Sequence, residues 1–310
     1  MPEKSNFEKL LEAGKFTVTA EIGPPMSASV SNVRKKAQGL KGYVDAVYIT
    51  DNQTAMVRMS SIAAAKLVAE EGVEPVVQMT CRDRNRIALQ SDLLGAYALG
   101  LKNLLVLSGD HQSFGNHPGA KNVYDVDSTQ LIHALTRLQN DGEFMGGSPC
   151  KIKPRFFIGG AGHPFADPQE LQMIRLKKKI ESGARFITTQ AIYDIDKFKQ
   201  WMHLVRSQDL HKKAYIQAGI CVNKTLKSLQ MTQLVAGMDV PDYLINRMEQ
   251  AQDKQAEGVE IALDLLRQIM DIEGVSGIHI MAIGWEDIVP TIVEGLGVLP
   301  RPGSDGSEID

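Results

Sequence analysis

Several polar side chains of this chain follow short β-rich runs at the point where a turn begins. The first is Glu21, which directly precedes Ile22 and a Gly-Pro-Pro turn that ends strand pairing. A carboxyl group in this position suits general acid or base chemistry, and it also suits a solvated charge on an edge strand. Further residues at comparable positions are Thr50, Asp51, Asn52, Gln78, Thr80, Ser108, Gly109, Asp110, His163 and Gln190.

The elements that must position these residues alternate between two hydrophobic periods. Short β-branched or apolar runs bounded by turn residues predict eight strands, over 16–22, 44–50, 74–80, 103–108, 155–160, 185–190, 214–220 and 277–283. Helix-period segments predict helices over 31–39, 56–71, 84–100, 128–140, 168–182, 196–208, 224–236 and 286–296. Several of these helices stop at a glycine, as at Gly72, Gly100 and Gly183.

This alternation favours an α/β fold, because strands separated by helices pair in parallel through right-handed crossovers. Eight such units close a (β/α)8 TIM barrel, and the chain has neither a Gly-x-Gly-x-x-Gly turn after its first strand nor a Walker loop. Residues 241–272 form an extra helical segment before the last strand, and 110–127 form a long loop. We expect a single barrel domain over 1–300 and an acidic, flexible tail over 301–310.

The carboxyl ends of barrel strands meet at one mouth, where α/β barrels place their active sites. Any one of the polar residues above is equally well explained as a turn or capping residue. Their recurrence at one end of many strands is hard to reconcile with an apolar barrel core, and it favours an active site.

Composition excludes several other classes. A formal net charge of -3, with basic clusters that are only short and local, argues against nucleic acid as a partner. Three cysteines without a C-x-x-C pair argue against a disulfide framework and against a cysteine-bound iron–sulfur cluster, and favour a cytoplasmic location. No apolar run reaches the roughly 18–20 residues of a membrane span. No His-x-His or His-Glu-x-x-His motif predicts a metal site, and no lysine ends a predicted strand to form a Schiff base.

In order and placement, the motifs after successive strands resemble those of the methylenetetrahydrofolate reductase family, flavin-dependent barrels of one-carbon metabolism. The resemblance runs from about residue 16 to about residue 297. Its motifs are Ala-Glu-Ile-Gly-Pro-Pro (20–25), Val-Tyr-Ile-Thr (47–50), Gln-Met-Thr-Cys (78–81), Leu-Ser-Gly-Asp (107–110), Gly-His-Pro (162–164), Leu-Lys-Lys-Lys-Ile-Glu-Ser-Gly-Ala (176–184) and Ile-Thr-Thr-Gln-Ala-Ile-Tyr-Asp (187–194).

The resemblance implies an oxidoreductase that reduces methylenetetrahydrofolate to methyltetrahydrofolate by hydride transfer from reduced flavin. It implies that Glu21 is the general acid that protonates a folate nitrogen, and that Asp110 is a second catalytic residue near the flavin and the pterin. Glu21, Asp110 and Gln190 would bind the folate. The implied flavin-binding residues are Thr50, Gln78, Leu107, Ser108, Gly109, Asp110, His163 and Lys179.

The chain also departs from well-studied bacterial members at the rim of the site. Gln78 stands where those members have a histidine, Gly159-Gly-Ala161 replaces Tyr-Pro-Glu, Arg175 replaces an asparagine, and Trp285 replaces an arginine. The changes at Gln78, Gly159 and Arg175 affect the nucleotide half of the flavin site, so FMN fits as well as FAD, whereas Trp285 changes the rim where the folate tail would bind. The electrons would come from NAD(P)H or from an iron–sulfur or flavoprotein partner subunit.

Two other functions stay open at this level. One is a flavin-bearing electron-transfer or scaffold subunit that does not itself reduce folate. The other is a barrel lyase acting on a phosphorylated substrate, which would be colourless. Homo- and hetero-oligomers are both compatible with a barrel of this size.

Overall fold

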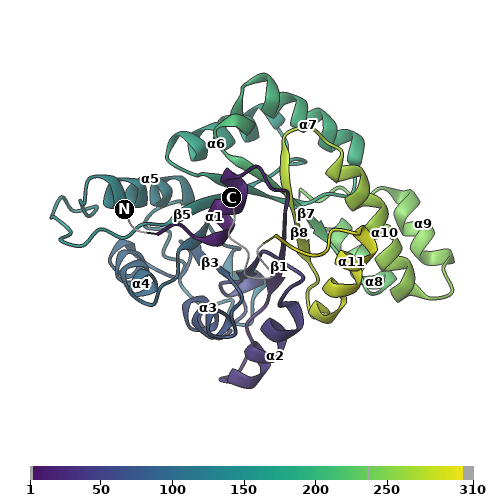
Figure 1. The fold of residues 1–310 in the computed structure, drawn as a ribbon, viewed down its shortest axis with the longest axis horizontal. Helices are drawn as coiled ribbons and strands as arrows, with labels where there is room; N and C mark the ends of the chain where they lie inside the picture. Colours follow the sequence, from purple (N-terminus) through teal and green to yellow (C-terminus); the bar gives the residue numbers. More distant parts are fainter. Residues whose placement is uncertain (1–2, 236, 303–310) are drawn as a thin grey trace.

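Eight parallel strands close into a barrel that helices surround, as Figure 1 shows. The structure is a computed structural model that describes residues 3–235 and 237–302. The strands are β1 (Thr17–Ile22), β2 (Ala46–Ile49), β3 (Pro75–Thr80), β4 (Asn103–Leu107), β5 (Phe157–Gly162), β6 (Phe186–Ala191), β7 (Tyr215–Cys221) and β8 (Val275–Met281). Each strand pairs with its neighbours in sequence, and β8 closes the ring on β1. The predicted TIM barrel is therefore confirmed.

The helices occupy the intervals between strands. They are α1 (Asn6–Glu12), α2 (Val30–Leu40), α3 (Ser61–Glu70), α4 (Arg86–Ala98), α5 (Ser128–Asn140), α6 (Gln169–Glu181), α7 (Ile195–Ser207), α8 (Leu226–Gln233), α9 (Asp242–Gln250), α10 (Lys254–Met270) and α11 (Val289–Leu296). Short 3-10 turns are η1 (Gln53–Ala55), η2 (Gln112–Phe114), η3 (Leu210–Lys212) and η4 (Glu286–Ile288). The glycines at 72, 100 and 183 have φ of +77°, +83° and +117°, as expected of helix-ending positions.

The extra helical segment before the last strand is confirmed as two helices, α9 and α10. They gather with α8 and α11 on one side of the barrel (Figure 1). Asp253 separates them, because its side chain accepts hydrogen bonds from the first backbone N–H groups of α10.

Most predicted helices lie within three residues of the observed ends, and two differences are larger. The helix predicted from residue 56 begins only at Ser61, because Asn52, Thr54 and Ala55 adopt left-handed backbone angles that turn the chain before it. Helix α1 was not predicted, although Ser5 caps it by accepting from the backbone N–H of Glu8. The expected tail over 301–310 lies outside the described residues, except for residues 301 and 302.

The end of the barrel opposite the mouth is closed by aromatic side chains. Phe7 of α1 packs edge-on against Phe157 and Phe186, with ring centroids 5.7 and 5.5 Å apart. Gly159 makes room for this packing, since a Cβ there would lie 2.2 Å from the Phe186 ring. Above this layer the buried interior turns polar, with Thr19, Thr188, Gln217 and His279. The polar interior leads upward to the mouth.

In the part of the chain that the structure describes, no helix is both long and apolar enough to cross a bilayer.

Gly159→Ala should destabilise the barrel by about 1–3 kcal/mol, because the added methyl group must displace the buried Phe186 ring. Gly39→Ala is the matched control: Gly39 lies in α2 with open space around its missing Cβ, and alanine there should stabilise by up to about 1 kcal/mol. Urea unfolding of both variants measures the two free energies. Equal stability of Gly159→Ala and the wild type would contradict this packing.

Candidate active site

Glu21 lies at the mouth end of β1 and is 8% exposed. Its Oε1 accepts a hydrogen bond from the side-chain amide of Gln53, and its Oε2 accepts one from the amide of Gln78, both at 3.2 Å. The His279 ring lies beside the carboxyl group, with Nε2 3.9 Å from Oε2. Two neutral amides are therefore the side-chain hydrogen-bond donors to this buried carboxyl group.

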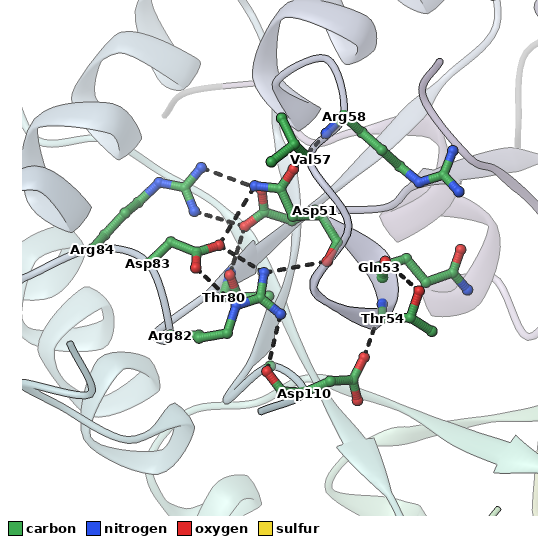
Figure 2. A network of polar contacts seen from close by, with 12 residues as sticks. Asp51, Gln53, Thr54, Val57, Arg58, Thr80, Arg82, Asp83, Arg84 and Asp110 are labelled. Carbon is green, nitrogen blue, oxygen red and sulfur yellow. Dashed lines mark hydrogen bonds and ion pairs between the residues drawn. The ribbon is translucent and has the colours of Figure 1, made fainter. Parts of the chain in front are cut away.

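Asp110, the other predicted catalytic carboxylate, is exposed and follows β4. Its Oδ2 accepts a hydrogen bond from the backbone N–H of Thr54 at 3.0 Å, as Figure 2 shows. Thr54 adjoins Gln53, the residue that contacts Glu21. Consecutive residues of η1 thus bind the two carboxylates, and η1 lies over the mouth between them.

A buried guanidinium group holds the loops after β2, β3 and β4 together (Figure 2). The Arg82 side chain is 3% exposed and forms a bidentate ion pair with Asp83. It also donates to the carbonyl oxygens of Asn52, at 3.2 Å, and Asp110, at 3.1 Å. Because one rigid donor fork reaches three loops, it fixes where Asp110 and η1 stand.

Asp51 ties the ends of β2 and β3 together. Its Oδ2 accepts from both the backbone N–H and the hydroxyl of Thr80 at 2.9 Å, and from Arg84 at 2.7 Å. Arg84 also binds the exposed carboxylate of Asp92. Of the predicted cluster Thr50, Asp51 and Asn52, Asp51 therefore supports the loops of the mouth.

A positively charged corner lies at the end of β5 and along α6. Lys179 donates to the carbonyl oxygen of Ala161 at 2.7 Å rather than to a carboxylate. Burial, followed by the nearby Arg175, lowers the pKa of Lys179 to about 8. Burial, followed by Lys179 and Arg175, lowers the pKa of His163 to about 4, so His163 is neutral at pH 7. This corner suits an anion such as a phosphate group.

The other predicted site residues occupy the mouth in different ways. Thr50 is buried, and its hydroxyl has no hydrogen-bond partner. Gly109 has φ of +92°, and a Cβ there would lie 3.1 Å from the Cβ atoms of Thr80 and Arg82. Gln190 is half-buried where the pairing of β6 with β7 shifts register. Leu107 is half-buried, and the exposed Ser108 bonds Ser128 at 3.3 Å.

Hydrogen bonds join Glu21 directly to Gln78, and they join Asp110 to Glu21 through η1. His163 lies with Lys179 in the charged corner. The backbone carbonyl oxygen of Gln190 accepts a hydrogen bond from the hydroxyl of Thr189 at 2.8 Å. The Gln190 side chain is not joined to the other predicted residues by these contacts.

Sequence reasoning missed three residues of the site: Gln53, Arg82 and His279. His279 could have been found from the two-residue alternation of β8, because Gly277, His279 and Met281 share one face of that strand. Gln53 carried no comparable signal, since its position depends on the left-handed turn of η1.

The residues at the mouth fit a phosphate-bearing flavin. The unpartnered Thr50 hydroxyl offers a polar contact, Gly109 allows close approach of the backbone, and the charged corner suits a phosphate. Within residues 3–235 and 237–302 there is no group of three or more histidine, cysteine, aspartate or glutamate side chains that could hold a metal ion.

Comparison with known proteins identifies the family of the chain. The family model described as methylenetetrahydrofolate reductase matches residues 6–297. The chain belongs to the methylenetetrahydrofolate reductase family. The resemblance drawn from the motifs is thereby confirmed.

Family relatives are distant in sequence. A protein of Caenorhabditis elegans named "Probable methylenetetrahydrofolate reductase (NADPH)" is 24% identical over 96% of this chain and 44% of its own length. The chain thus spans about half the length of such eukaryotic relatives. A 5,10-methylenetetrahydrofolate reductase of Pectobacterium carotovorum is 23% identical over 93% of this chain and 92% of its own length.

Among solved structures, an uncharacterized protein from Clostridium thermocellum superimposes with a TM-score of 0.66 at 14% identity. It covers 94% of this chain and 98% of its own, and it is described as binding two copies of 5-methyl-5,6,7,8-tetrahydrofolic acid. At this identity the match supports the barrel fold.

Asp51→Asn should destabilise the protein by about 3 kcal/mol or more, because it leaves the Arg84 guanidinium half-buried without its inner carboxylate. Asp92→Asn removes the other carboxylate of the same arginine, which is 41% exposed, and should cost less than about 1 kcal/mol. Chemical denaturation compares the two variants. Similar losses for both would show that the buried pair does not support the rim.

Proposed function

We propose that this chain is a flavin-dependent reductase that converts methylenetetrahydrofolate to methyltetrahydrofolate. The observation that carries the proposal is Glu21, a carboxyl buried at the barrel mouth and bound by neutral amides rather than by lysine or arginine. Family membership and the folate-binding description of the Clostridium thermocellum protein support the same substrate class.

In the proposed reaction, Glu21 gives a proton to a bridging nitrogen of the bound folate. This opens the methylene bridge and leaves a positively charged carbon–nitrogen bond on the substrate. A bound flavin supplies the hydride that this bond accepts.

Asp110 would stabilise the positive charge that develops on the folate. Its carboxylate is exposed at the mouth and bonds a backbone N–H of η1, so it is available to a ligand when η1 shifts. Gln190, at the end of β6, would bind the pterin through its side-chain amide. Both roles follow from family membership together with position at the mouth.

Thr50, Gly109, His163 and Lys179 would hold the flavin, with Gln78, Leu107 and Ser108 beside it. Both FAD and FMN fit these residues. The electrons would come from NAD(P)H or from an iron–sulfur or flavoprotein subunit, and the reaction would take place in the cytoplasm. The three cysteines are free, which supports a reducing compartment.

Glu21→Gln should retain bound flavin and lose at least about a hundredfold in the rate of folate reduction, because glutamine cannot supply the proton. The flavin is first reduced with an artificial donor, so that the natural donor does not enter the measurement. Reduced protein is then mixed with methylenetetrahydrofolate, and flavin reoxidation is followed by absorbance.

Glu70→Gln, a change to a carboxylate that is 38% exposed on α3, is the control and should behave like the wild type. If Glu21→Gln reoxidises as fast as the control and yields methyltetrahydrofolate, Glu21 is not the acid.

Affinity for a phosphate-bearing flavin should fall as pH rises through about 8, because the Lys179 ammonium is charged below that value and neutral above it. The loss should reach up to about tenfold per pH unit. Lys179→Gln should bind more weakly without this pH dependence. Lys178→Gln, on the exposed face of α6, should keep it.

Fluorescence titration of the flavin-free protein measures these affinities, with riboflavin as the ligand that lacks phosphate. A wild-type affinity for FMN that stays constant from pH 7 to 9.5 would rule out Lys179 as the phosphate contact.

A further inference from the structure

The two side-chain amides that bind Glu21 come from different parts of the fold. Gln78 belongs to β3, where it is 7% exposed and is paired in register with Leu105 of β4. Gln53 belongs to η1, a single turn in the loop after β2, and is half-buried. Within the described residues, Glu21 is the only side chain that either amide bonds, at 3.2 Å in both cases. One donor thus comes from the barrel wall and the other from a loop.

Strand pairing holds Gln78 in place. Strands β1 and β3 both pair with β2, so the amide of Gln78 reaches Glu21 across the interior of the barrel. Two residues further along β3, the backbone N–H and the hydroxyl of Thr80 both donate to Asp51 at 2.9 Å. Movement of this end of β3 would break these bonds together with the strand ladder. We therefore expect Gln78 to stay beside Glu21 when a ligand enters the mouth.

Gln53 stands on strained backbone. Its neighbours Asn52, Thr54 and Ala55 have φ of 46°, 53° and 56°, a left-handed conformation that non-glycine residues rarely adopt. Such strain persists while surrounding contacts impose it, and one of those contacts is the bond from the Thr54 N–H to the exposed Asp110 (Figure 2). A shift of η1 can relieve strain, whereas a shift of β3 breaks its ladder. Gln53 is therefore the amide that a ligand can displace.

The two carboxyl oxygens of Glu21 consequently have different surroundings. Oε2 faces side chains of barrel strands, with the Gln78 amide at 3.2 Å and Nε2 of His279 at 3.9 Å. Oε1 faces the loop, where Gln53 is its one side-chain hydrogen-bond donor among the described residues. Displacement of Gln53 leaves Oε1 open to the mouth, while Oε2 keeps its donor.

We propose that Gln78 is the positioning residue of Glu21 and that Oε1 is the oxygen that meets the folate, an inference that rests on the proposed function. The folate takes the place of the Gln53 amide at Oε1, and Gln78 keeps the carboxyl group oriented through Oε2. The Oε1–H bond of the acid then breaks as an N–H bond forms on the folate nitrogen. The electrons of the Oε1–H bond stay on Glu21, and those of the carbon–nitrogen bond that opens go to that nitrogen.

Gln78 also favours this transfer energetically. The carboxylate that remains after the transfer carries negative charge on both oxygens, and a hydrogen bond to a charged acceptor is stronger than one to a neutral acid. The amide of Gln78 is in place before this charge forms, so its bond strengthens during the step and not on binding. Loss of this donor should therefore slow the step without weakening the binding of folate.

The kinetic test separates the rate at saturating folate from the folate concentration that gives half of that rate. Flavin is reduced with an artificial donor, and its reoxidation is followed over a range of methylenetetrahydrofolate concentrations. Gln78→Met, which keeps the length of the side chain but removes the donor, should lower the saturating rate about tenfold or more and change the half-saturating concentration less than about twofold. Gln268→Ala, on the exposed face of α10, is the control and should match the wild type.

A histidine at position 78 supplies the rescue. Gln78→His restores an N–H donor, so its saturating rate should return to within about threefold of the wild type. Recovery in Gln78→His but not in Gln78→Met shows that the donor matters and not merely the packing of the side chain. Equal losses in the two variants would overturn the role of the donor.

A binding test is independent of turnover. Methyltetrahydrofolate is titrated by calorimetry into the oxidised, flavin-loaded protein. Gln53→Ala should bind it about fivefold more tightly, because the ligand no longer has to displace the resting bond to Oε1. Gln78→Met should bind it within about twofold of the wild type. Gln53→Ala changes a loop residue, so its comparison with the wild type holds even where Gln78→Met does not fold.

The outcomes separate the two proposals. A wild-type protein that does not reduce methylenetetrahydrofolate overturns the proposed function, and the role of Gln78 with it. A wild type that reduces folate, combined with a Gln78→Met rate equal to that of the wild type, overturns the role of Gln78 alone. Equal affinities of Gln53→Ala and the wild type for methyltetrahydrofolate overturn the assignment of Oε1.

Discussion

The site depends on keeping one carboxyl group buried without a lysine or arginine as its ion-pair partner. Burying a carboxylate costs free energy, and proteins usually offset that cost with a lysine or arginine partner. Such a partner keeps the carboxylate ionised. Glu21 is instead held by two neutral amides, with the His279 ring beside it. A ligand at the mouth can take the place of either amide without breaking an ion pair to lysine or arginine. A permanent guanidinium partner would make Glu21 a structural carboxylate and not an acid.

The other charged groups at the mouth are paired with one another or lie apart from Glu21. Arg82 and Arg84 neutralise Asp83 and Asp51, and in doing so they tie the loops after β2, β3 and β4 into one rim. The charged corner around Lys179 lies apart, at β5 and α6, where it does not pair with Glu21. Between them, η1 contacts both Glu21 and Asp110, so a ligand that enters must exchange contacts with both carboxylates at once.

Sequence alone predicted the barrel well because most strands combine a short β-branched or apolar run with a turn that ends it. All eight strands were placed within two residues of their observed ends. Strand ends in turn placed Glu21, Gln78 and Asp110 at the mouth. Gln53 was missed because the turn that positions it is held by a hydrogen bond from Thr54 to Asp110, two residues 56 positions apart. The pairing of His279 with Glu21 was missed because it arises only when β8 closes on β1.

The most direct test of the account is a single turnover of the wild-type protein without its natural electron donor. The flavin-loaded protein is reduced under anaerobic conditions, freed of excess reductant and mixed with methylenetetrahydrofolate, and flavin absorbance and folate products are measured together. The account predicts that flavin is reoxidised and that methyltetrahydrofolate forms in equal amount. Flavin that stays reduced in the presence of saturating methylenetetrahydrofolate would contradict it.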